Sequence, residues 1–87
     1  MFYTYILISE KTNRYYIGCT NNVNSRLIRH NNGYVHSTKA YRPWKLLYSE
    51  KFNLLKDARK REKQMKSWKN RSSIEKLVLA TLVADHE

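Results

Sequence analysis

The chain has 87 residues and a formal net charge of +10, with 17 Lys and Arg residues against seven Asp and Glu residues. A chain this short has room for one hydrophobic core, so we expect a single domain over residues 1–87. The charge excess favours a polyanionic partner, and nucleic acid is the usual one. A generally basic surface, or attraction to an anionic membrane, would give the same total charge.

The cysteine and histidine content argues against a disulfide-stabilised or zinc-binding protein. Cys19 is the single cysteine, so no internal disulfide is possible, and a reducing, cytoplasmic location is expected. The three histidines, His30, His36 and His86, lack zinc-ligand spacing. The N-terminus has no basic region before its apolar run, so no signal peptide is expected. No apolar stretch approaches the roughly twenty residues that span a bilayer, so no membrane association is expected.

The first part of the chain predicts a strand hairpin followed by a helix. Residues 2–8 and 14–19 are rich in aromatic and β-branched residues and predict two strands, joined by a polar turn over residues 9–13. Apolar residues then recur at helical spacing over residues 21–32, and Gly33 favours a helix end. Three residues are candidates for the N-cap of this helix: Thr20, Asn21 and Asn22.

The second part predicts a loop, a strand and two helices. Residues 34–42 have no clear period and predict a loop, and residues 44–52 predict a third strand. Asn53 is expected to cap a long helix that reaches about Lys69. Ser72 and Glu75 have capping-box spacing and predict a last helix over residues 73–83. The order β-β-α-β-α-α indicates an α+β fold, a small antiparallel sheet covered by helices, with its core at about residues 2–70.

Two polar side chains fall on or beside the apolar stripe of the first predicted helix. Val23 and Leu27 centre this stripe, His30 projects onto it, and Arg26 lies at its edge. A cation at the margin of a core usually meets an anion. For these two residues alone, an arginine that extends outward and a histidine that is simply packed in the core are the more ordinary interpretation.

A carboxylate interrupts the apolar stripe of the long predicted helix. Glu62 shares one helix face with Leu55, Ala58 and Met65. A carboxylate that faces a core is costly unless it is paired or binds a cation. Two interpretations are evenly balanced: Glu62 pairs with an Arg or Lys from another element, or it binds a divalent ion such as Mg²⁺ through oxygen.

The second predicted strand carries two tyrosines and a glycine. Tyr15 and Tyr16 point to opposite faces, so that one packs while the other faces a cleft. Packing is the commoner role for a strand tyrosine. Gly18 would let a phosphate or a side chain approach the backbone closely. A hydroxyl group, an arginine and a metal-binding carboxylate are together the parts of a phosphodiester hydrolase.

These residues also carry a family resemblance. Tyr16-Ile17-Gly18 matches the second half of the GIY-YIG motif, and in Tyr3-Thr4-Tyr5 only the last residue matches the first half. Arg26 follows Tyr16 by ten residues and His30 follows it by fourteen, while Glu62 falls on a later helix. The chain therefore resembles the GIY-YIG nuclease superfamily over nearly its whole length, and looks most like the small stand-alone bacterial members.

The resemblance implies a three-stranded antiparallel sheet flanked by helices, and a role for each matched residue. Tyr16 would be the general base or would orient the attacking water, with Tyr5 supporting it through a hydrogen bond. Arg26 would bind the scissile phosphate, and His30 would assist proton transfer or phosphate contact. Glu62 would hold one Mg²⁺ or Mn²⁺ ion. Cys19 stands where some repair-type relatives carry a lysine.

Basic residues that lie outside this set would contact the nucleic-acid backbone. From Lys56 to Arg71 they greatly outnumber acidic ones, and phosphate contacts of this kind give salt-dependent binding without sequence reading. The candidates are Arg14, Arg29, Lys39, Arg42, Lys45, Lys60 and Lys63. The loop of residues 34–42 mixes aromatic and basic residues, so it either grips unpaired strands by stacking or is an ordinary surface loop.

The leading hypothesis is a metal-dependent endonuclease that acts on DNA more than RNA, in repair or recombination. A chain of this size has no room for a separate sequence reader, so cleavage would be directed by structure or weakly selective, or a partner protein would supply targeting. The first alternative is a nucleic-acid-binding module without turnover, for which the incomplete first half-motif argues. The second is a protein–protein adaptor built on a retired nuclease fold.

Overall fold

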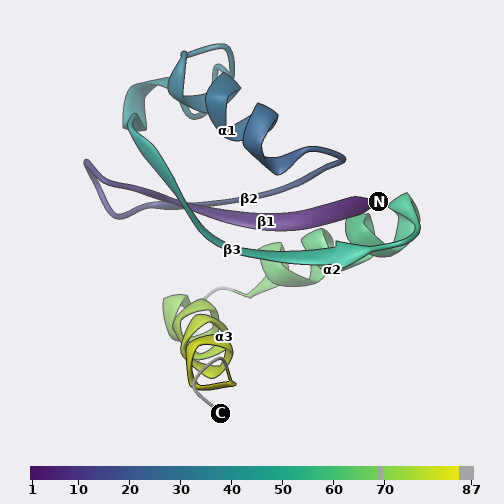
Figure 1. Cartoon of the computed structure of the whole chain (residues 1–87). Coiled ribbons are helices and arrows are strands. Elements are labelled where there is room, and N and C mark those ends of the chain that lie inside the picture. The colour runs from purple at the N-terminus through teal and green to yellow at the C-terminus, as the bar shows by residue number, and fades with distance from the viewer. Residues whose placement is uncertain (69, 85–87) are drawn as a thin grey trace.

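A three-stranded antiparallel sheet forms the centre of the structure, and helices lie on both of its faces (Figure 1). The computed structural model describes residues 1–68 and 70–84, the last two by their backbone only. The order β-β-α-β-α-α and the α+β class predicted from the sequence are confirmed. None of the helices within the described residues has the length and apolar character to cross a membrane.

The first strand is the middle strand of the sheet. β1 (Phe2–Ser9) pairs on one side with β2 (Tyr15–Thr20) and on the other with β3 (Trp44–Phe52), in the order β2-β1-β3. Both pairings are antiparallel, and Tyr5 lies opposite Gly18 on β2 and opposite Ser49 on β3. The middle position explains why β1 is the most buried and most apolar of the three strands, because both of its edges and both of its faces are covered.

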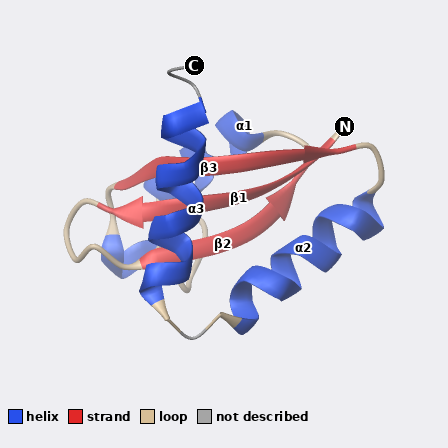
Figure 2. Cartoon of the chain, turned by 90° about the horizontal axis from the view of Figure 1, so that it is seen from below, coloured by secondary structure: helices blue, strands red, loops and turns tan. Residues whose placement is uncertain are grey.

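Side-chain alternation along the strands divides the core into two layers. On one face, Tyr5 and Leu7 pack with Trp44 beneath α1 (Val23–Asn31). On the other face, Ile6 packs with Met65 of α2 (Leu55–Ser67) and with Ile74 of α3 (Arg71–Ala84). Figure 2 shows α2 and α3 on the same side of the sheet, with α1 behind it. β2 is an edge strand of the sheet and lies between the two layers.

The ends of α1 follow the local chemistry of the sequence. Asn22 is the N-cap, and its side-chain oxygen accepts a hydrogen bond from the backbone N–H of Ser25 at 2.9 Å. At the other end, Gly33 has φ +80° and its N–H donates to the carbonyl of His30 at 3.2 Å. A left-handed residue just beyond a helix is a common stop and favours glycine. The cap is one of the three candidates offered by the sequence, and the predicted stop of this helix is confirmed.

The ends of the later helices differ from the predictions. The N-cap of α2 is Leu54, which makes no side-chain capping bond, so the expected cap at Asn53 is wrong. The carbonyl of Leu54 already accepts from the N–H groups of Asp57 and Ala58, which places the first turn after Asn53. α2 ends at Ser67, and the predicted end at Lys69 lies outside the described residues.

The last helix begins earlier than its expected capping box. The side-chain oxygen of Asn70 accepts a hydrogen bond from the N–H of Ser72 at 3.0 Å, and α3 starts at Arg71. Ser72 is therefore inside the first turn and cannot serve as the N-cap. Glu75 instead lies 4.0 Å from the Arg71 guanidinium, one turn away on the same helix. The loop predicted over residues 34–42 contains a short 3₁₀ helix, Lys39–Tyr41.

Candidate active site

A buried chain of hydrogen bonds joins β1, α1 and the following loop. The hydroxyl of Tyr5 lies 3.1 Å from Nε2 of His30, and Nδ1 of His30 lies 2.8 Å from the hydroxyl of Thr38. All three side chains are at most 1% exposed. Because Thr38 donates to the carbonyl of Val35 at 3.3 Å, its oxygen accepts from Nδ1–H, and Nε2 is left to accept from Tyr5.

Burial keeps the groups of this chain uncharged. Burial, together with the positive charges of Arg26 and Arg29, lowers the pKa of His30. Burial also raises the pKa of Tyr5, and the neighbouring Tyr16 adds to this effect. Neutral imidazole and neutral phenol are the forms that the hydrogen bonds require. Tyr5 is therefore a hydrogen-bond donor in the resting protein.

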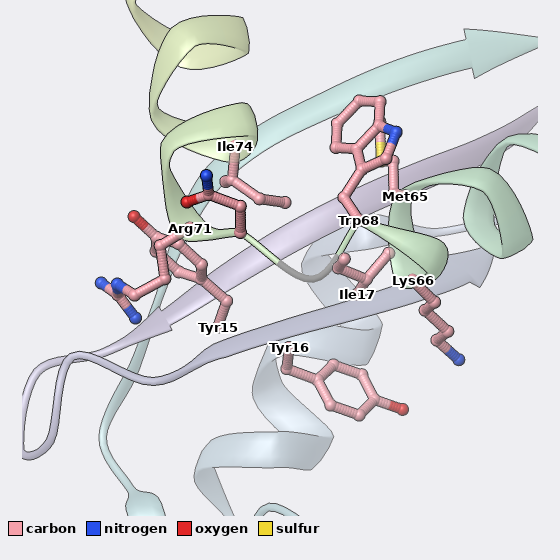
Figure 3. A pocket seen from close by; sticks show the side chains of 9 residues that line it. Tyr15, Tyr16, Ile17, Met65, Lys66, Trp68, Arg71 and Ile74 are labelled. Carbon is pink, nitrogen blue, oxygen red and sulfur yellow. The ribbon is translucent and has the colours of Figure 1, made fainter.

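Tyr16 is the phenol of this cluster that keeps contact with solvent. Its ring centroid lies 4.7 Å from that of His30 in an edge-on arrangement, and 6.3 Å from that of Tyr5. Tyr16 is half-buried, unlike Tyr5. Figure 3 shows its ring extending to the opposite side of β2 from Tyr15 and Ile74. Alternation along the strand thus separates the two tyrosines, with Tyr15 in the α2–α3 layer and Tyr16 beside His30.

Gly18 makes room for the Tyr5 ring. The two residues face each other across the β1–β2 pair. A Cβ atom on Gly18 would lie 2.5 Å from the Tyr5 hydroxyl oxygen and 2.6 Å from Cζ. The sequence predicted a close approach at this glycine by a phosphate or a side chain, and in the structure a side chain makes it.

Glu62 is partly buried and pairs with a lysine of its own helix. One carboxylate oxygen accepts a hydrogen bond from Nζ of Lys66 at 2.8 Å, and the Glu62 side chain is 21% exposed. Among the side chains that the structure describes, the cation paired with Glu62 is Lys66, one turn further along the same helix, and none comes from another element. A partly exposed carboxylate whose lysine partner is itself exposed remains accessible to solvent cations.

The charges of Glu62 and Arg26 reach the same part of the sheet. Burial is the main cause that raises the pKa of the Cys19 thiol, and the negative charge of Glu62 raises it further, while Arg26 lowers it. The charge of Glu62 also raises the pKa of Tyr5, and the charge of Arg26 also lowers it. Both charged groups therefore lie near the β1–β2 pair. The structure brings Tyr5, Tyr16 and His30 into contact, while Arg26 of α1 and Glu62 of α2 are each near enough to influence the pKa of Tyr5.

The donor set around Glu62 fits a hard divalent ion better than zinc. Residues 1–68 and 70–84 contain no group of three or more His, Cys, Asp and Glu side chains that would enclose a metal, and His86 lies outside them. Mg²⁺ commonly keeps several water ligands and binds through one or two carboxylates. A single, partly exposed glutamate is compatible with that mode. His30 is unsuited to metal binding here because both of its ring nitrogens are hydrogen-bonded.

The basic residues proposed to contact nucleic acid lie on more than one surface. Lys39 and Arg42 line a surface hollow near the start of β3, whereas Lys60 lines another near its end. A strand of this length separates its two ends by about 26 Å. Arg14 lies 4.5 Å above the Tyr41 ring. Three more candidates are exposed at other points of the chain: Arg29, Lys45 and Lys63.

A comparison with protein-family models identifies the family of this chain. The model of the GIY-YIG catalytic domain matches residues 1–76. The chain belongs to the GIY-YIG family. Among its relatives, the UPF0213 protein SSP2268 of Staphylococcus saprophyticus is 34% identical over 73 residues, which cover 83% of this chain and 88% of the relative. The UPF0213 protein SERP0126 of Staphylococcus epidermidis is 41% identical over 54 residues, which cover 61% and 66% respectively. No solved structure matches this sequence.

Family membership makes the chain a nuclease-type domain, and it gives meaning to the departure in the first GIY-YIG half-motif. Thr4 stands where the motif has isoleucine and is completely buried on the α2 side of the sheet. Its hydroxyl donates to the carbonyl of Ala58 at 2.6 Å. In an α-helix that carbonyl also accepts from the N–H four residues later, which belongs to Glu62. The substituted residue therefore ties the sheet to the turn of α2 that carries the carboxylate.

Sequence reasoning missed two residues that contact the candidate site residues, Thr38 and Lys66. Thr38 orients His30 from a loop without periodicity, and no local pattern marks it. The one available signal was that a buried histidine requires partners for both ring nitrogens. Lys66 was detectable, because it follows Glu62 at the spacing of a helical ion pair.

Proposed function

We propose that this chain is a divalent-metal-dependent endonuclease that hydrolyses phosphodiester bonds in DNA. The observation that carries the proposal is the grouping at the β1–β2 pair. A half-buried phenol, Tyr16, packs against a neutral His30 that Tyr5 and Thr38 orient. The charges of Arg26 and Glu62 act on the same place.

In the proposed reaction Tyr16 acts directly on the attacking water. Its hydroxyl accepts a hydrogen bond from the water, and orients it or removes its proton as the water attacks phosphorus. His30 is fully buried with both nitrogens bonded, so it acts as a positioning residue that holds the rings of Tyr5 and Tyr16. Arg26 is half-buried, and its guanidinium binds the scissile phosphate and offsets the charge that develops there.

Glu62 would hold one Mg²⁺ or Mn²⁺ ion, which supplies positive charge at the phosphate when it is bound. Lys66 must release the carboxylate for this to happen, because it occupies one of the oxygens. The ion pair is exposed on the lysine side, so its loss costs little. Lys66 is then free to contact the substrate backbone.

The substrate proposal rests on charge and size. A net charge of +10 on 87 residues favours a polyanion, and we assign DNA before RNA. The described residues are used in the sheet and its covering helices, so cleavage is directed by DNA structure, or weakly by sequence, in a repair or recombination role. A partner protein that supplies targeting and a cytoplasmic location belong to the same proposal.

The test is hydrolysis of branched, nicked, flapped and linear DNA with Mg²⁺, with Mn²⁺, and with EDTA. We expect metal-dependent cleavage that falls by about 100-fold or more in Glu62→Gln and in Tyr16→Phe. Matched controls are Glu10→Gln and Tyr34→Phe, which make the same changes at exposed positions and should cleave like the wild type. Cleavage that survives both site variants would refute the assignment.

A second candidate is a nucleic-acid-binding module without turnover. It is favoured by the ion pair between Glu62 and Lys66, which neutralises the carboxylate, and by the incomplete first half-motif. It predicts salt-sensitive binding that persists in EDTA, and no cleavage of any of the four DNA substrates.

A further inference from the structure

A pocket of about 320 Å³ opens at the edge of β2, where the chain passes from α2 to α3 (Figure 3). Apolar side chains from three elements form its floor, namely Ile17 of β2, Met65 of α2 and Ile74 of α3. Met65 and Ile74 are buried at 0% and 4% exposure, so the floor is formed by the packed core. The volume is at the lower end of the range for small-ligand pockets, about 300–1,000 Å³.

Aromatic rings and cations form the rest of the lining. Figure 3 shows Tyr15 and Arg71 at one end of the pocket, and Trp68 and Lys66 at the other. The Arg71 guanidinium lies 4.1 Å above the Tyr15 ring and donates to the carbonyl of Asn13 at 2.8 Å, so it is held in place. Both rings are half-buried, and the Arg61 guanidinium lies 5.4 Å from the centre of the Trp68 ring. The pocket has an apolar floor, an aromatic ring at each end and cations at its rim. This combination suits a flat heteroaromatic ring that carries a phosphate.

The pocket is continuous with the candidate active site through two of its own residues. Lys66 lines the pocket and binds the Glu62 carboxylate at 2.8 Å. Tyr16 borders the pocket from β2, and its ring packs against His30 on the other side of the strand. A base held against Trp68 would therefore have its phosphate near Lys66, whose ammonium binds Glu62.

We propose that this pocket binds one unpaired nucleobase of the strand to be cut, next to the scissile phosphate. A base inside a duplex is covered on both faces by its neighbours, so only an unstacked base has a ring face free for the pocket. The pocket thus makes the enzyme selective for junctions, flaps or single-stranded segments. Cleavage of the bound strand rests on the proposed function, whereas the binding of the base does not.

The test compares two fluorescent oligonucleotides with the same number of phosphates, in EDTA. One is a short thymidine strand, and the other is an abasic strand of the same length, so the difference in Kd isolates the base. We expect the thymidine strand to bind about 10-fold more tightly to the wild type. Trp68→Leu and Tyr15→Leu should abolish the difference, and Trp68→Phe should keep it. Thermal unfolding of each variant verifies that it is folded.

A matched control separates this pocket from the loop of residues 34–42. Tyr34 is 72% exposed on that loop, and Tyr34→Leu should leave the preference for bases unchanged. If Tyr34→Leu removes the preference and Trp68→Leu does not, the loop holds the base and the pocket assignment is overturned. A wild type that binds both strands equally overturns it as well.

A second measurement uses the wild type alone. A strand with a single 2-aminopurine should lose emission on binding, because the base stacks on Trp68 or Tyr15, and unchanged emission contradicts the proposal. Failure of the nuclease assignment is distinguishable from failure of the pocket. Glu62→Gln should stop cleavage and retain the preference for bases. A wild type that prefers the thymidine strand but cleaves no substrate overturns the proposed function alone. A wild type that cleaves DNA but shows no such preference overturns the assignment of the pocket alone.

Discussion

The contact between Gly18 and Tyr5 leads to a quantitative prediction for Gly18→Ala. The added Cβ would lie 2.5 Å, 2.6 Å and 2.9 Å from the hydroxyl oxygen, Cζ and Cε1 of Tyr5. Tyr5 is 1% exposed, so its ring cannot move into solvent, and a forced shift of this kind costs about 1–3 kcal/mol. The shift also breaks the 3.1 Å bond to His30, which leaves a buried nitrogen unpaired at a cost of about 1–3 kcal/mol more.

The sum predicts a loss of about 2–6 kcal/mol in the free energy of unfolding. For a domain of this size each kcal/mol lowers Tm by about 4–8 °C, so Tm should fall by about 8 °C or more. Circular dichroism during heating and urea titration measures it. The matched control is Ser49→Ala, which faces Tyr5 from β3 and is exposed, so its effect should stay within about 0.5 kcal/mol.

A double-mutant cycle with Tyr5→Leu decides the cause. Removal of the ring removes the clash, so Gly18→Ala should cost much less in the Tyr5→Leu background than in the wild type. An equal cost in both backgrounds, or a Tm for Gly18→Ala within about 2 °C of the wild type, would refute the steric reasoning.

Three further predictions concern the surroundings of the same site. Burial lowers the pKa of His30, so as pH falls below about 6.5 the unfolded chain binds a proton at this residue before the folded chain does. Tm should therefore decrease from about pH 6.5 down to the lower pKa of the folded state. His30→Gln should show a flatter profile of Tm against pH. Lys66→Met removes the ammonium that lies 2.8 Å from the Glu62 carboxylate, so Mn²⁺ should bind about 2- to 5-fold more tightly in calorimetry without nucleic acid, and weaker binding would contradict this. Thr38→Val leaves Nδ1 of His30 without a partner and should cost about 1–3 kcal/mol in urea titration, whereas Thr38→Ser should cost far less.

The sheet and its covering helices follow from local patterns in the sequence. Aromatic and β-branched runs mark all three strands, and β3 has the predicted bounds, Trp44–Phe52. Alternation along β2 correctly separates Tyr15 from Tyr16. These features are predictable because the side-chain period of a strand is a backbone property that tertiary contacts rarely override.

Helix starts were less predictable, because several polar residues compete for each cap. Asn53 and Ser72 both suit an N-cap by type, yet the structure uses Leu54 and Asn70. The choice depends on the residue at which the preceding strand or turn ends. No short window of sequence contains that information.

His30 and Glu62 were visible in the sequence as interruptions in apolar patterns, whereas their partners interrupt no such pattern. His30 and Glu62 stood out because polar groups on apolar stripes are costly. Thr38 and Lys66, which bind them, lie in a loop and on an exposed helical surface where polar residues are ordinary. Trp68 and Arg71 did not stand out, because the pocket they line exists only once α3 folds back beside β2. The roles assigned to the site residues stay predictions.

The hydrogen bond from Thr4 to Ala58 has a consequence for how the incomplete first half-motif is interpreted. Its acceptor is a backbone carbonyl, which every residue type at position 58 would supply, so the bond depends on the hydroxyl of Thr4 alone. This directional bond anchors β1 to the helical turn that leads to Glu62. Threonine at the isoleucine position of the motif thus makes a structural contact of its own, and this departure does not by itself indicate loss of activity.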